Sequence, residues 1–334
     1  MKLANNHIGY WLVVLLGLFV GSCSNDGGDE MTIVLLPDTQ TYAEKSPHIL
    51  SSQIDWIAAN ADSIDLVLQQ GDLTQNNNEQ EWTIVREAFS RLDEKVPYVL
   101  ALGNHDMGSM PGKFADTRNS DLFNSFFPVS TMKKLPAFAG TFEPGKMDNA
   151  FYLMEHGDLR WMVLSLEFGP RQAVVDWANE LVEQHPSYNV IVNTHCYMYS
   201  DSTRQGEGDY WRPQGYGVGA GVGADAVHDG EQLWDQLIRR HANIRFVFSG
   251  HILNGGVGNL VSINDAGFSV YQFLANYQEG VKGSKEGGSG FLRILKLNTK
   301  NNTLRVRSYS PYTDEYLVKD GHDFTVRDVV LTHE

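Results

Sequence analysis

The sequence has few cysteines, few basic residues and only one long apolar run. Two cysteines among 334 residues cannot build a disulfide framework, so packing, hydrogen bonds or bound metals must stabilise the chain. The 26 basic side chains are outnumbered by 41 acidic ones, which gives a formal charge of −15. Because non-specific binding to nucleic acids depends on a surplus of Lys and Arg facing phosphates, we do not expect nucleic-acid polymers as partners.

The one long apolar run lies at the N-terminus. Residues 11–20 follow Lys2 and are too few to span a membrane, which takes about 20 residues, so the run is typical of a secretory signal. Small residues then precede Cys23, as in bacterial lipoprotein signals. We therefore expect residues 1–22 to be a signal peptide, Cys23 to carry lipid and residues 23–30 to form a flexible tether. The protein would be exported and anchored in the periplasm, at the outer membrane or at the cell surface. An ordinary cleaved signal is the alternative.

From residue 31 onward, short apolar runs alternate with segments of helical spacing. Runs at 32–37, 64–69 and 98–102 predict buried strands, and the helices between them predict parallel pairing. Further strands are predicted at 150–155, 160–166, 189–193, 244–249, 260–263, 269–274, 291–297 and 303–309, and further helices around 174–182 and 233–238. The sequence has no internal repeat and no clear linker, so we expect residues 31–334 to form a single α/β domain.

Five of the apolar runs stop at a side chain that can bind a metal ion. These residues are Asp38, Asp72, Asn104, His195 and His251. The carboxyl ends of parallel strands lie along one edge of a sheet, so the five side chains should converge on one crevice. Carboxylates, an amide and imidazoles together suit Mn, Fe or Zn. Gly immediately precedes three of the five, where it lets the backbone turn sharply and approach the site closely.

The motifs around these residues resemble those of the calcineurin-like metallophosphoesterase family. The family series is D-x-H, G-D-x-x-D, G-N-H-D/E, H and G-H-x-H. In the same order this chain reads Asp38-Thr39-Gln40, Gly71-Asp72-Leu73-Thr74-Gln75, Gly103-Asn104-His105-Asp106, His195 and Gly250-His251-Ile252-Leu253. The resemblance covers residues 31 to about 255. It implies a four-layer α/β/β/α sandwich of two mixed β-sheets, in which the later strands fit the second sheet.

The resemblance implies divalent metal ions as cofactors, two in number, drawn from Mn, Fe, Zn or Mg. The second metal site would be complete. Its ligands would be Asp72 as a bridging carboxylate, together with Asn104, His195 and His251.

The first metal site departs from the family pattern. Gln40 stands where the family has a His, and Leu253 stands where it has the last His. That leaves Asp38, Gln40 and the shared Asp72, an oxygen-only set that should weaken Zn binding and favour Mn, Mg or Ca. Asn254 is a candidate replacement ligand, although a solvent-facing turn residue is the commoner reading.

The resemblance also implies hydrolysis of a phosphodiester or phosphomonoester in a small substrate. A hydroxide between the metals would attack phosphorus in line. His105 would act as the general acid that protonates the leaving group, and Asp106 would hold the tautomer of its imidazole. The alternative is a non-catalytic binding or scaffold lipoprotein on a degenerate version of the fold, suggested by Gln40 and Leu253. The complete second site and the His105–Asp106 pair favour the enzyme.

A long loop, residues 200–230, follows His195 and should overhang the crevice. Arg204 and Trp211 in this loop are candidates to bind a phosphate or stack on a substrate ring. Arg171, beyond a neighbouring strand, is a third candidate substrate residue. A mobile, solvated loop and a surface position for Arg171 are the alternatives.

Two further residues stand close to predicted strand ends. Cys196 adjoins His195, but neighbours along a strand point to opposite faces, so we expect a buried thiol rather than a nucleophile. Asn276 ends a later strand, and either it faces the crevice or it lies at a polar edge.

Overall fold

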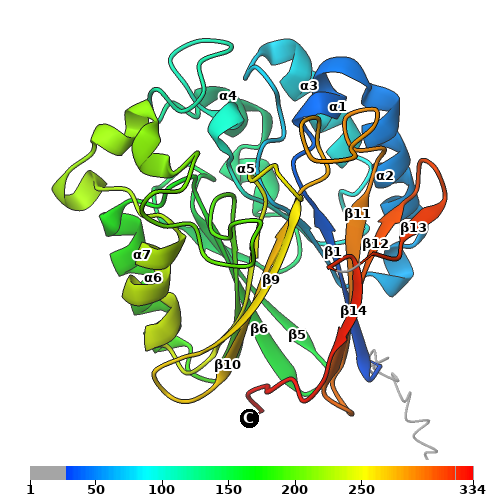
Figure 1. The fold of residues 1–334 in the computed structure, drawn as a ribbon, viewed down its shortest axis with the longest axis vertical. Helices are drawn as coiled ribbons and strands as arrows, with labels where there is room; N and C mark the ends of the chain where they lie inside the picture. Colours follow the sequence, from blue (N-terminus) through cyan, green and yellow to red (C-terminus); the bar gives the residue numbers. More distant parts are fainter. Residues whose placement is uncertain (1–27, 320, 334) are drawn as a thin grey trace, which may run out of the picture.

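The computed structural model describes residues 28–319 and 321–333. The predicted signal peptide, Cys23 and most of the predicted tether lie outside these residues. Within the described part, two seven-stranded sheets face each other between layers of helices (Figure 1). The expected α/β/β/α sandwich of two mixed sheets is therefore confirmed.

The first sheet is built around three parallel strands from the N-terminal part of the chain. Its order is β13-β12-β11-β1-β2-β3, and β14 pairs with β12. The strands are β1 (Glu30–Leu36), β2 (Leu66–Gln69), β3 (Tyr98–Leu100), β11 (Leu292–Asn298), β12 (Thr303–Ser310), β13 (Glu315–Leu317) and β14 (Asp323–Val326). β1, β2 and β3 pair in parallel, whereas β11 runs antiparallel to β1. Because both faces of the central strands are covered, β1 and β2 read as continuous apolar runs.

The second sheet has the order β4-β5-β6-β7-β8-β10-β9. Its strands are β4 (Phe138–Thr141), β5 (Ala150–His156), β6 (Leu159–Leu166), β7 (Tyr188–Thr194), β8 (Ile244–Ser249), β9 (Val257–Ile263) and β10 (Ser269–Ala275). The expectation that the later strands belong to the second sheet is only partly right. β9 and β10 join β8 there, but β11 to β14 extend the first sheet beside β1. Local patterning identifies a strand and does not specify its partner, because pairing is a long-range contact.

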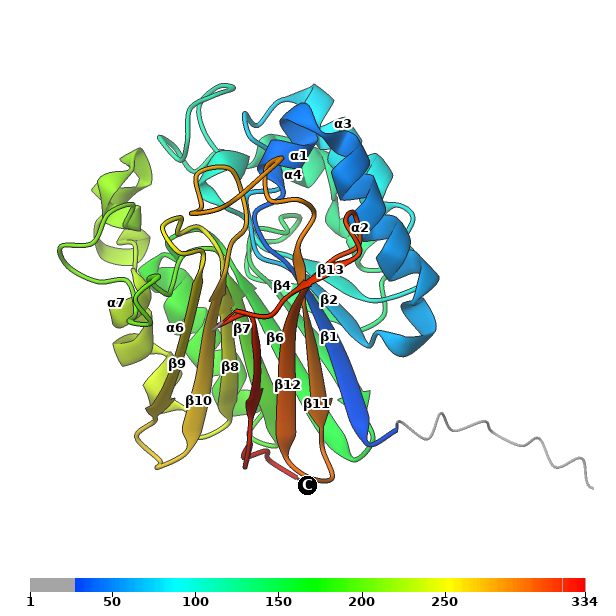
Figure 2. The same cartoon turned by 45° about the vertical axis from the view of Figure 1, so that its right-hand side comes forward.

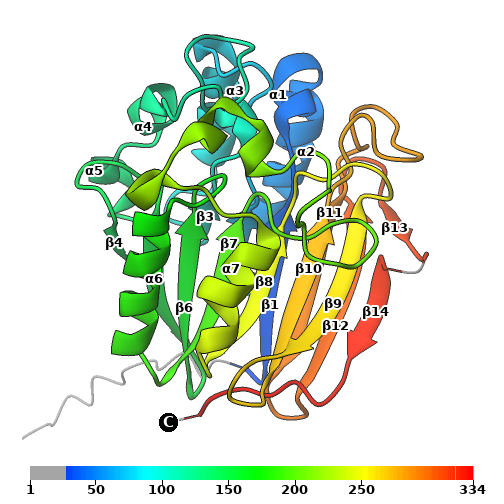
Figure 3. The same cartoon turned by 60° about the vertical axis from the view of Figure 1, so that its left-hand side comes forward.

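The helices are α1 (Gln40–Lys45), α2 (Pro47–Ala59), α3 (Glu79–Phe89), α4 (Asp121–Phe126), α5 (Val129–Met132), α6 (Gln172–Gln184) and α7 (Gly230–Gln236). α2 starts at Pro47, which needs no hydrogen-bond partner in the first turn. α6 and α7 cover the outer face of the second sheet (Figure 3). None of the helices in residues 28–319 and 321–333 is long and apolar enough to cross a membrane.

Aromatic side chains fill the space between the two sheets. Trp161 stacks on Phe246 with ring centroids 6.2 Å apart. Phe273 of the second sheet meets Phe324 of the first, edge to face, at 5.5 Å. This shared core holds the sheets at a fixed separation, so that loops from both can build one site.

The domain begins slightly earlier than composition indicates. β1 starts at Glu30, and the Gly28 carbonyl accepts a hydrogen bond from Nε2 of His156 at 2.9 Å. The Asp29 carbonyl accepts from the Thr299 amide at 2.8 Å. Residues 28–30, which composition places in the flexible tether, therefore belong to the folded domain. The sequence gives no sign of this, because the partners of these residues, such as His156, Lys296 and Thr299, are distant along the chain.

β1, β2 and β3 are parallel to one another, as are β7 and β8, and the carboxyl ends of both groups lie at one end of the sandwich, the upper end in Figure 3. Figure 2 shows the loops at this end, close to α1 and α4. Two buried amides bridge the sheets there: Asn193 donates to the Gln69 carbonyl at 2.9 Å, and Gln70 donates to the Ser249 carbonyl at 3.1 Å. The predicted crevice thus spans the edges of two sheets rather than one.

Candidate metal centre

Buried ligand atoms from both sheets meet at this end of the sandwich. One ligand atom each from Asp72, His195 and His251 lies within 4.8 Å of the others. Nε2 of His195 is 3.2 Å from Oδ2 of Asp72 and 3.2 Å from Oδ1 of Asn104. The structure therefore brings together the four residues of the second site. β2 and β3 supply the oxygens, and β7 and β8 supply the imidazoles.

The two imidazoles are oriented by backbone carbonyls. Nδ1 of His195 is 2.8 Å from the Gln70 carbonyl, and Nε2 of His251 is 2.7 Å from the Trp211 carbonyl. A carbonyl only accepts, so each of these nitrogens carries a proton. The remaining nitrogens face each other at 3.1 Å. Two lone pairs at this separation fit a shared cation, so the donor set suits a divalent metal ion.

Without a metal, one proton is held within this cluster. Burial lowers the pKa of His195, but the Asp72 and Asp38 carboxylates and the Gln70 carbonyl together raise it to about 9. Burial, followed by the charge on His195, lowers the pKa of His251 to about 3. Burial would raise the pKa of Asp72, yet His195 and the other nearby imidazoles bring it below its usual range. The cluster thus needs a positive charge at this place, and a metal cation supplies one.

Asp38 and Gln40 lie on the other side of Asp72. Both Asp38 oxygens accept from the His251 amide, at 3.0 and 3.1 Å, and Nε2 of Gln40 is 3.1 Å from Oδ2 of Asp72. Oε1 of Gln40 is buried and has no hydrogen-bond partner among the described residues. The amide of Gln40 thus lies beside the Asp72 carboxylate and carries an unpaired oxygen, a donor that suits a hard cation, so the first-site residues are also assembled.

Asn254 is placed elsewhere. It is exposed, and its carbonyl accepts from the Lys282 amide. Leu253 lines the crevice without offering a donor atom. The turn-residue reading of Asn254 is therefore the one that the structure favours.

Three of the predicted ligands have a strained backbone. Asp38, Asp72 and His251 have φ values of 41°, 52° and 74°, in the left-handed region that costs a non-Gly residue about 1–3 kcal/mol. Such strain persists only where the surrounding structure imposes it, and it clusters at functional sites.

The glycines before the ligands are required by close packing. A Cβ on Gly103 would lie 2.0 Å from Oδ1 of Asp72, and one on Gly250 would lie 2.1 Å from Oδ2 of Asp38. At Gly71, whose φ is +94°, it would lie 2.5 Å from the His195 ring. Each glycine thus leaves room for a ligand that a neighbouring strand contributes.

His105 lines the crevice beside the cluster. Its Nδ1 is 2.8 Å from the Gln75 carbonyl, which leaves Nε2 for a substrate. Its ring packs on Phe114 at 3.9 Å between centroids, and its amide donates to Oδ1 of Asp72 at 2.9 Å. The backbone and the ring of His105 are therefore both fixed relative to the bridging carboxylate.

The role predicted for Asp106 is wrong in one respect. Its carboxylate does not contact the His105 imidazole, whose tautomer is held by the Gln75 carbonyl instead. Asp106 is buried and accepts from the amides of Gly103, Leu73 and Thr74. It therefore joins the two turns that carry Asp72 and Asn104. The partner of His105 is a backbone carbonyl, which every residue has, so this contact could not be predicted from the sequence.

The loop from 200 to 230 is fixed on the crevice by several contacts. Besides the carbonyl of Trp211, the ring of Tyr216 packs on Phe168 at 5.1 Å, and the Ala226 carbonyl accepts from the Gln172 amide at 2.9 Å. Within the loop, Arg212 pairs with Asp229 at 2.6 Å. The loop contains short 3-10 turns rather than a continuous helix or strand. It forms one wall of a cavity of about 260 Å³.

Of the three predicted substrate residues, only Trp211 lines this crevice. Arg204 pairs with Glu231 at 2.9 Å and lies over the Trp234 ring. Arg171 pairs with Glu167 at 2.8 Å and with Glu143 at 3.3 Å. Both guanidinium groups are thus held by carboxylates away from the crevice.

Sequence reasoning missed three lining residues, namely Phe114, Tyr216 and Gln278. The first two lie in irregular segments and follow no spacing rule. Gln278 lies three residues after the end of β10. Polar residues after strand ends were the signal for the predicted ligands, and the same signal points to the segment that contains Gln278. Asn276, our candidate there, is buried, and its Oδ1 accepts from the Gln278 amide at 3.0 Å.

Cys196 is buried, as expected. Burial raises the pKa of its thiol, with Asp229 as a smaller contribution. The thiol contacts Oε1 of Gln205 rather than the imidazole of His195, so it is not poised as a nucleophile.

The sequence model of the family described as "Calcineurin-like phosphoesterase" matches residues 31–255. The chain belongs to this family. Membership supports a phosphoester hydrolase that uses divalent metal ions, in agreement with the buried Asp/His/His cluster.

One relative is a Bacillus subtilis (strain 168) protein described as "Uncharacterized protein YvnB". It is 26% identical over 309 residues, which cover 87% of this chain and 21% of the relative. The chain therefore spans about a fifth of that protein's length.

Two solved structures match the chain, and the first of them shares its fold. The purple acid phosphatase PPD1 from yellow lupin (Lupinus luteus) seeds gives a TM-score of 0.54 at 14% identity, covering 89% of this chain and 54% of that one. A 5'-nucleotidase precursor from Thermus thermophilus gives a TM-score of 0.47 at 16% identity, covering 89% and 55%. The chain spans about half of each.

A glycine pair tests the packing of the centre. Gly250→Ala places a methyl group on Asp38, whereas Gly255, five residues further on, has no atom within 4 Å of the corresponding position. We expect Gly250→Ala to weaken metal binding by about tenfold or more, because it displaces a ligand, and Gly255→Ala to leave binding unchanged. Metal titration of the metal-free protein by calorimetry measures both. Equal affinities in the two variants would contradict this account of the centre.

Proposed function

We propose that the protein is a metal-dependent phosphoesterase that hydrolyses a small phosphodiester or phosphomonoester. The observation that carries the proposal is the buried cluster of Asp72, His195 and His251, with His105 beside it in the same crevice. Family membership supports the same class of reaction. The proposal includes two divalent ions, of which the first is the more weakly bound.

The residues at the crevice would have two roles, metal binding and proton donation. Asp72, Asn104, His195 and His251 would hold the second ion. Bound divalent ions supply an activated water and neutralise phosphate oxygens. Because Nδ1 of His105 donates its hydrogen bond to the Gln75 carbonyl, Nε2 is left for the substrate, and the doubly protonated imidazolium would donate its Nε2 proton to the departing oxygen.

The crevice favours a small substrate. Its volume of about 260 Å³ is just below the common range for ligand pockets, roughly 300–1,000 Å³. Phe114, Trp211 and Tyr216 line it, so an apolar or aromatic leaving group would find rings to pack on. The overall charge of −15 repels polyanions, while metal ions make the crevice itself attractive to one phosphate.

The altered first site is the argument for a non-catalytic scaffold on this fold. Against it stand three strained ligand backbones and three tightly packed glycines. These features cost stability and serve no purpose in a scaffold, so the enzyme remains the better reading. Metal-dependent turnover of bis-aryl and mono-aryl phosphates by the purified chain tests the choice directly.

The general-acid role predicts a dependence on the leaving group. His105→Ala should lower kcat for an alkyl phosphate ester by about 10²–10⁴-fold, with bound metal unchanged because the side chain is not a ligand. For p-nitrophenyl esters, whose leaving group needs no proton, the loss should be much smaller. His48→Ala, at an exposed histidine, is the matched control. Equal losses for both esters would rule out proton donation by His105.

We also propose that the protein is exported and anchored to a membrane by lipid on Cys23. The support is the sequence of residues 11–23. β1 starts at the end of the sandwich opposite the crevice (Figure 1), so a tether entering there would leave the crevice facing away from the membrane. Metabolic labelling with palmitate should mark the wild-type protein and not Cys23→Ala. Equal labelling of the two would refute the anchor.

A further inference from the structure

The first metal site has one donor fewer than the second. Its position for a last imidazole is taken by Leu253, whose side chain is apolar. Leu253 packs against the segment that follows β10, because its Cδ1 lies 3.1 Å from where a Cβ on Gly280 would be. The side chain of Gln278, in the same segment, enters the crevice at this place.

Gln278 contacts the first-site residues directly. Its Nε2 is 3.1 Å from Oδ1 of Asp38, and its Oε1 is 2.6 Å from Nε2 of Gln40. Gln40 in turn reaches Oδ2 of Asp72 at 3.1 Å. Two amides thus lie between two carboxylates. Since a half-turn of an amide exchanges its oxygen and nitrogen, either group can present its oxygen to a cation held by Asp38 and Asp72.

Hydrogen bonds alone do not satisfy this cluster. Gln40 is fully buried, and its Oε1 has no partner in the described part of the chain. An unpaired buried acceptor costs about 1–3 kcal/mol. Asp38 is also buried, and it accepts hydrogen bonds from the His251 amide and from Nε2 of Gln278. A cation between Asp38 and Asp72 would compensate the two buried carboxylates, and a half-turn of the Gln40 amide would bring its oxygen to that cation.

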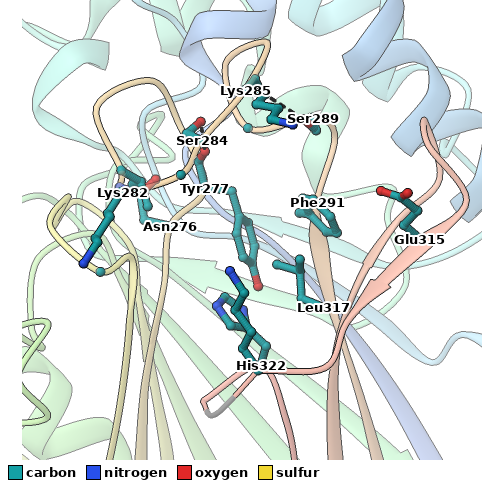
Figure 4. A pocket seen from close by; sticks show the side chains of 15 residues that line it. Asn276, Tyr277, Lys282, Ser284, Lys285, Ser289, Phe291, Glu315, Leu317 and His322 are labelled. Atoms are coloured by element: carbon teal, nitrogen blue, oxygen red, sulfur yellow. Dashed lines mark hydrogen bonds between the residues drawn. The ribbon is translucent and has the colours of Figure 1, made fainter.

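The turn that carries Gln278 is held rigidly from the other side. Figure 4 shows the ring of Tyr277 pointing toward His322, in a second cavity of about 230 Å³. The Tyr277 hydroxyl bonds to Oγ of Ser308 at 2.6 Å, and the Tyr277 carbonyl accepts from Ser284 at 2.7 Å. With Tyr277 anchored in that cavity, the next residue is fixed at the crevice, as a preorganised ligand requires.

We propose that Gln278 replaces the missing imidazole and completes a first site built only of oxygen donors. The four donors are Asp38, Gln40, Asp72 and Gln278. The inference rests on the proposed function and specifies which ions that site uses. Oxygen-only sites select Mn²⁺, Mg²⁺ or Ca²⁺ over Zn²⁺, whereas the second site, with two imidazoles, suits Zn²⁺, Fe²⁺ or Mn²⁺. The centre therefore holds a hard ion beside a borderline one.

The test is the stoichiometry and affinity of Mn²⁺ binding to the metal-free full chain, measured by calorimetry and by electron paramagnetic resonance. We expect two Mn²⁺ per wild-type chain with a spin-coupled signal. Gln278→Leu should weaken one of the two by about tenfold or more and leave the signal of a single uncoupled Mn²⁺. Gln278→His should restore the second equivalent and raise the Zn²⁺ affinity of that site.

The matched control is Glu279→Gln, at the next residue, whose exposed carboxylate pairs with Lys45. It should bind two Mn²⁺ as the wild type does, and circular dichroism should show that all the variants fold. One Mn²⁺ in the wild type, or two of unchanged affinity in Gln278→Leu, would overturn the inference and leave the proposed function standing. No bound Mn²⁺ in the wild type would overturn both.

Discussion

The structure depends on burying two carboxylates, Asp38 and Asp72, close together beside the crevice. Both are about 1% exposed. Burying negative charge is costly unless a cation or hydrogen bonds compensate it. The compensation comes from the neighbouring strands, whose imidazoles, amides and backbone N–H groups converge on the two side chains. The strained backbones of three ligands and the close-packed glycines follow from the same demand, since every group must approach within contact distance.

The need to compensate these two buried carboxylates explains why the site is built from two sheets. β1, β2 and β3 bring the oxygens, while β7 and β8 bring the imidazoles, and the aromatic core between the sheets sets how closely the two sets approach. Asp106 joins the two turns that carry Asp72 and Asn104, because its carboxylate accepts amide hydrogen bonds from both. The crevice is thus a product of the whole sandwich, and the loop from 200 to 230 adds its aromatic wall.

Most strands and most metal ligands could be predicted from the sequence, because an apolar run marks each buried strand and a polar residue suited to bind a metal follows it. Buried parallel strands read as apolar runs, and the residue after each run is a possible ligand. What cannot be read depends on long-range contacts. The pairing of β11 with β1, which places β11 to β14 in the first sheet, is a long-range contact. His105 is oriented by the backbone carbonyl of Gln75, which any residue type could supply. Gln278 lies in a turn that is fixed by Tyr277 in another cavity. Arg204 misleads for a related reason, because its partner Glu231 is distant in the sequence. For Arg171 only Glu143 is distant, whereas Glu167 lies four residues before it, a spacing that sequence reasoning can use.

The central claim is that metal ions bind where the carboxylates and imidazoles meet. The most direct measurement is a crystal structure of the protein soaked in Mn²⁺, with anomalous diffraction recorded at the manganese edge. The account predicts an anomalous peak within bonding distance of Asp72, Asn104, His195 and His251, and a second between Asp72 and Asp38. Crystals without a peak at the first of these positions, or with manganese bound only elsewhere, would contradict it.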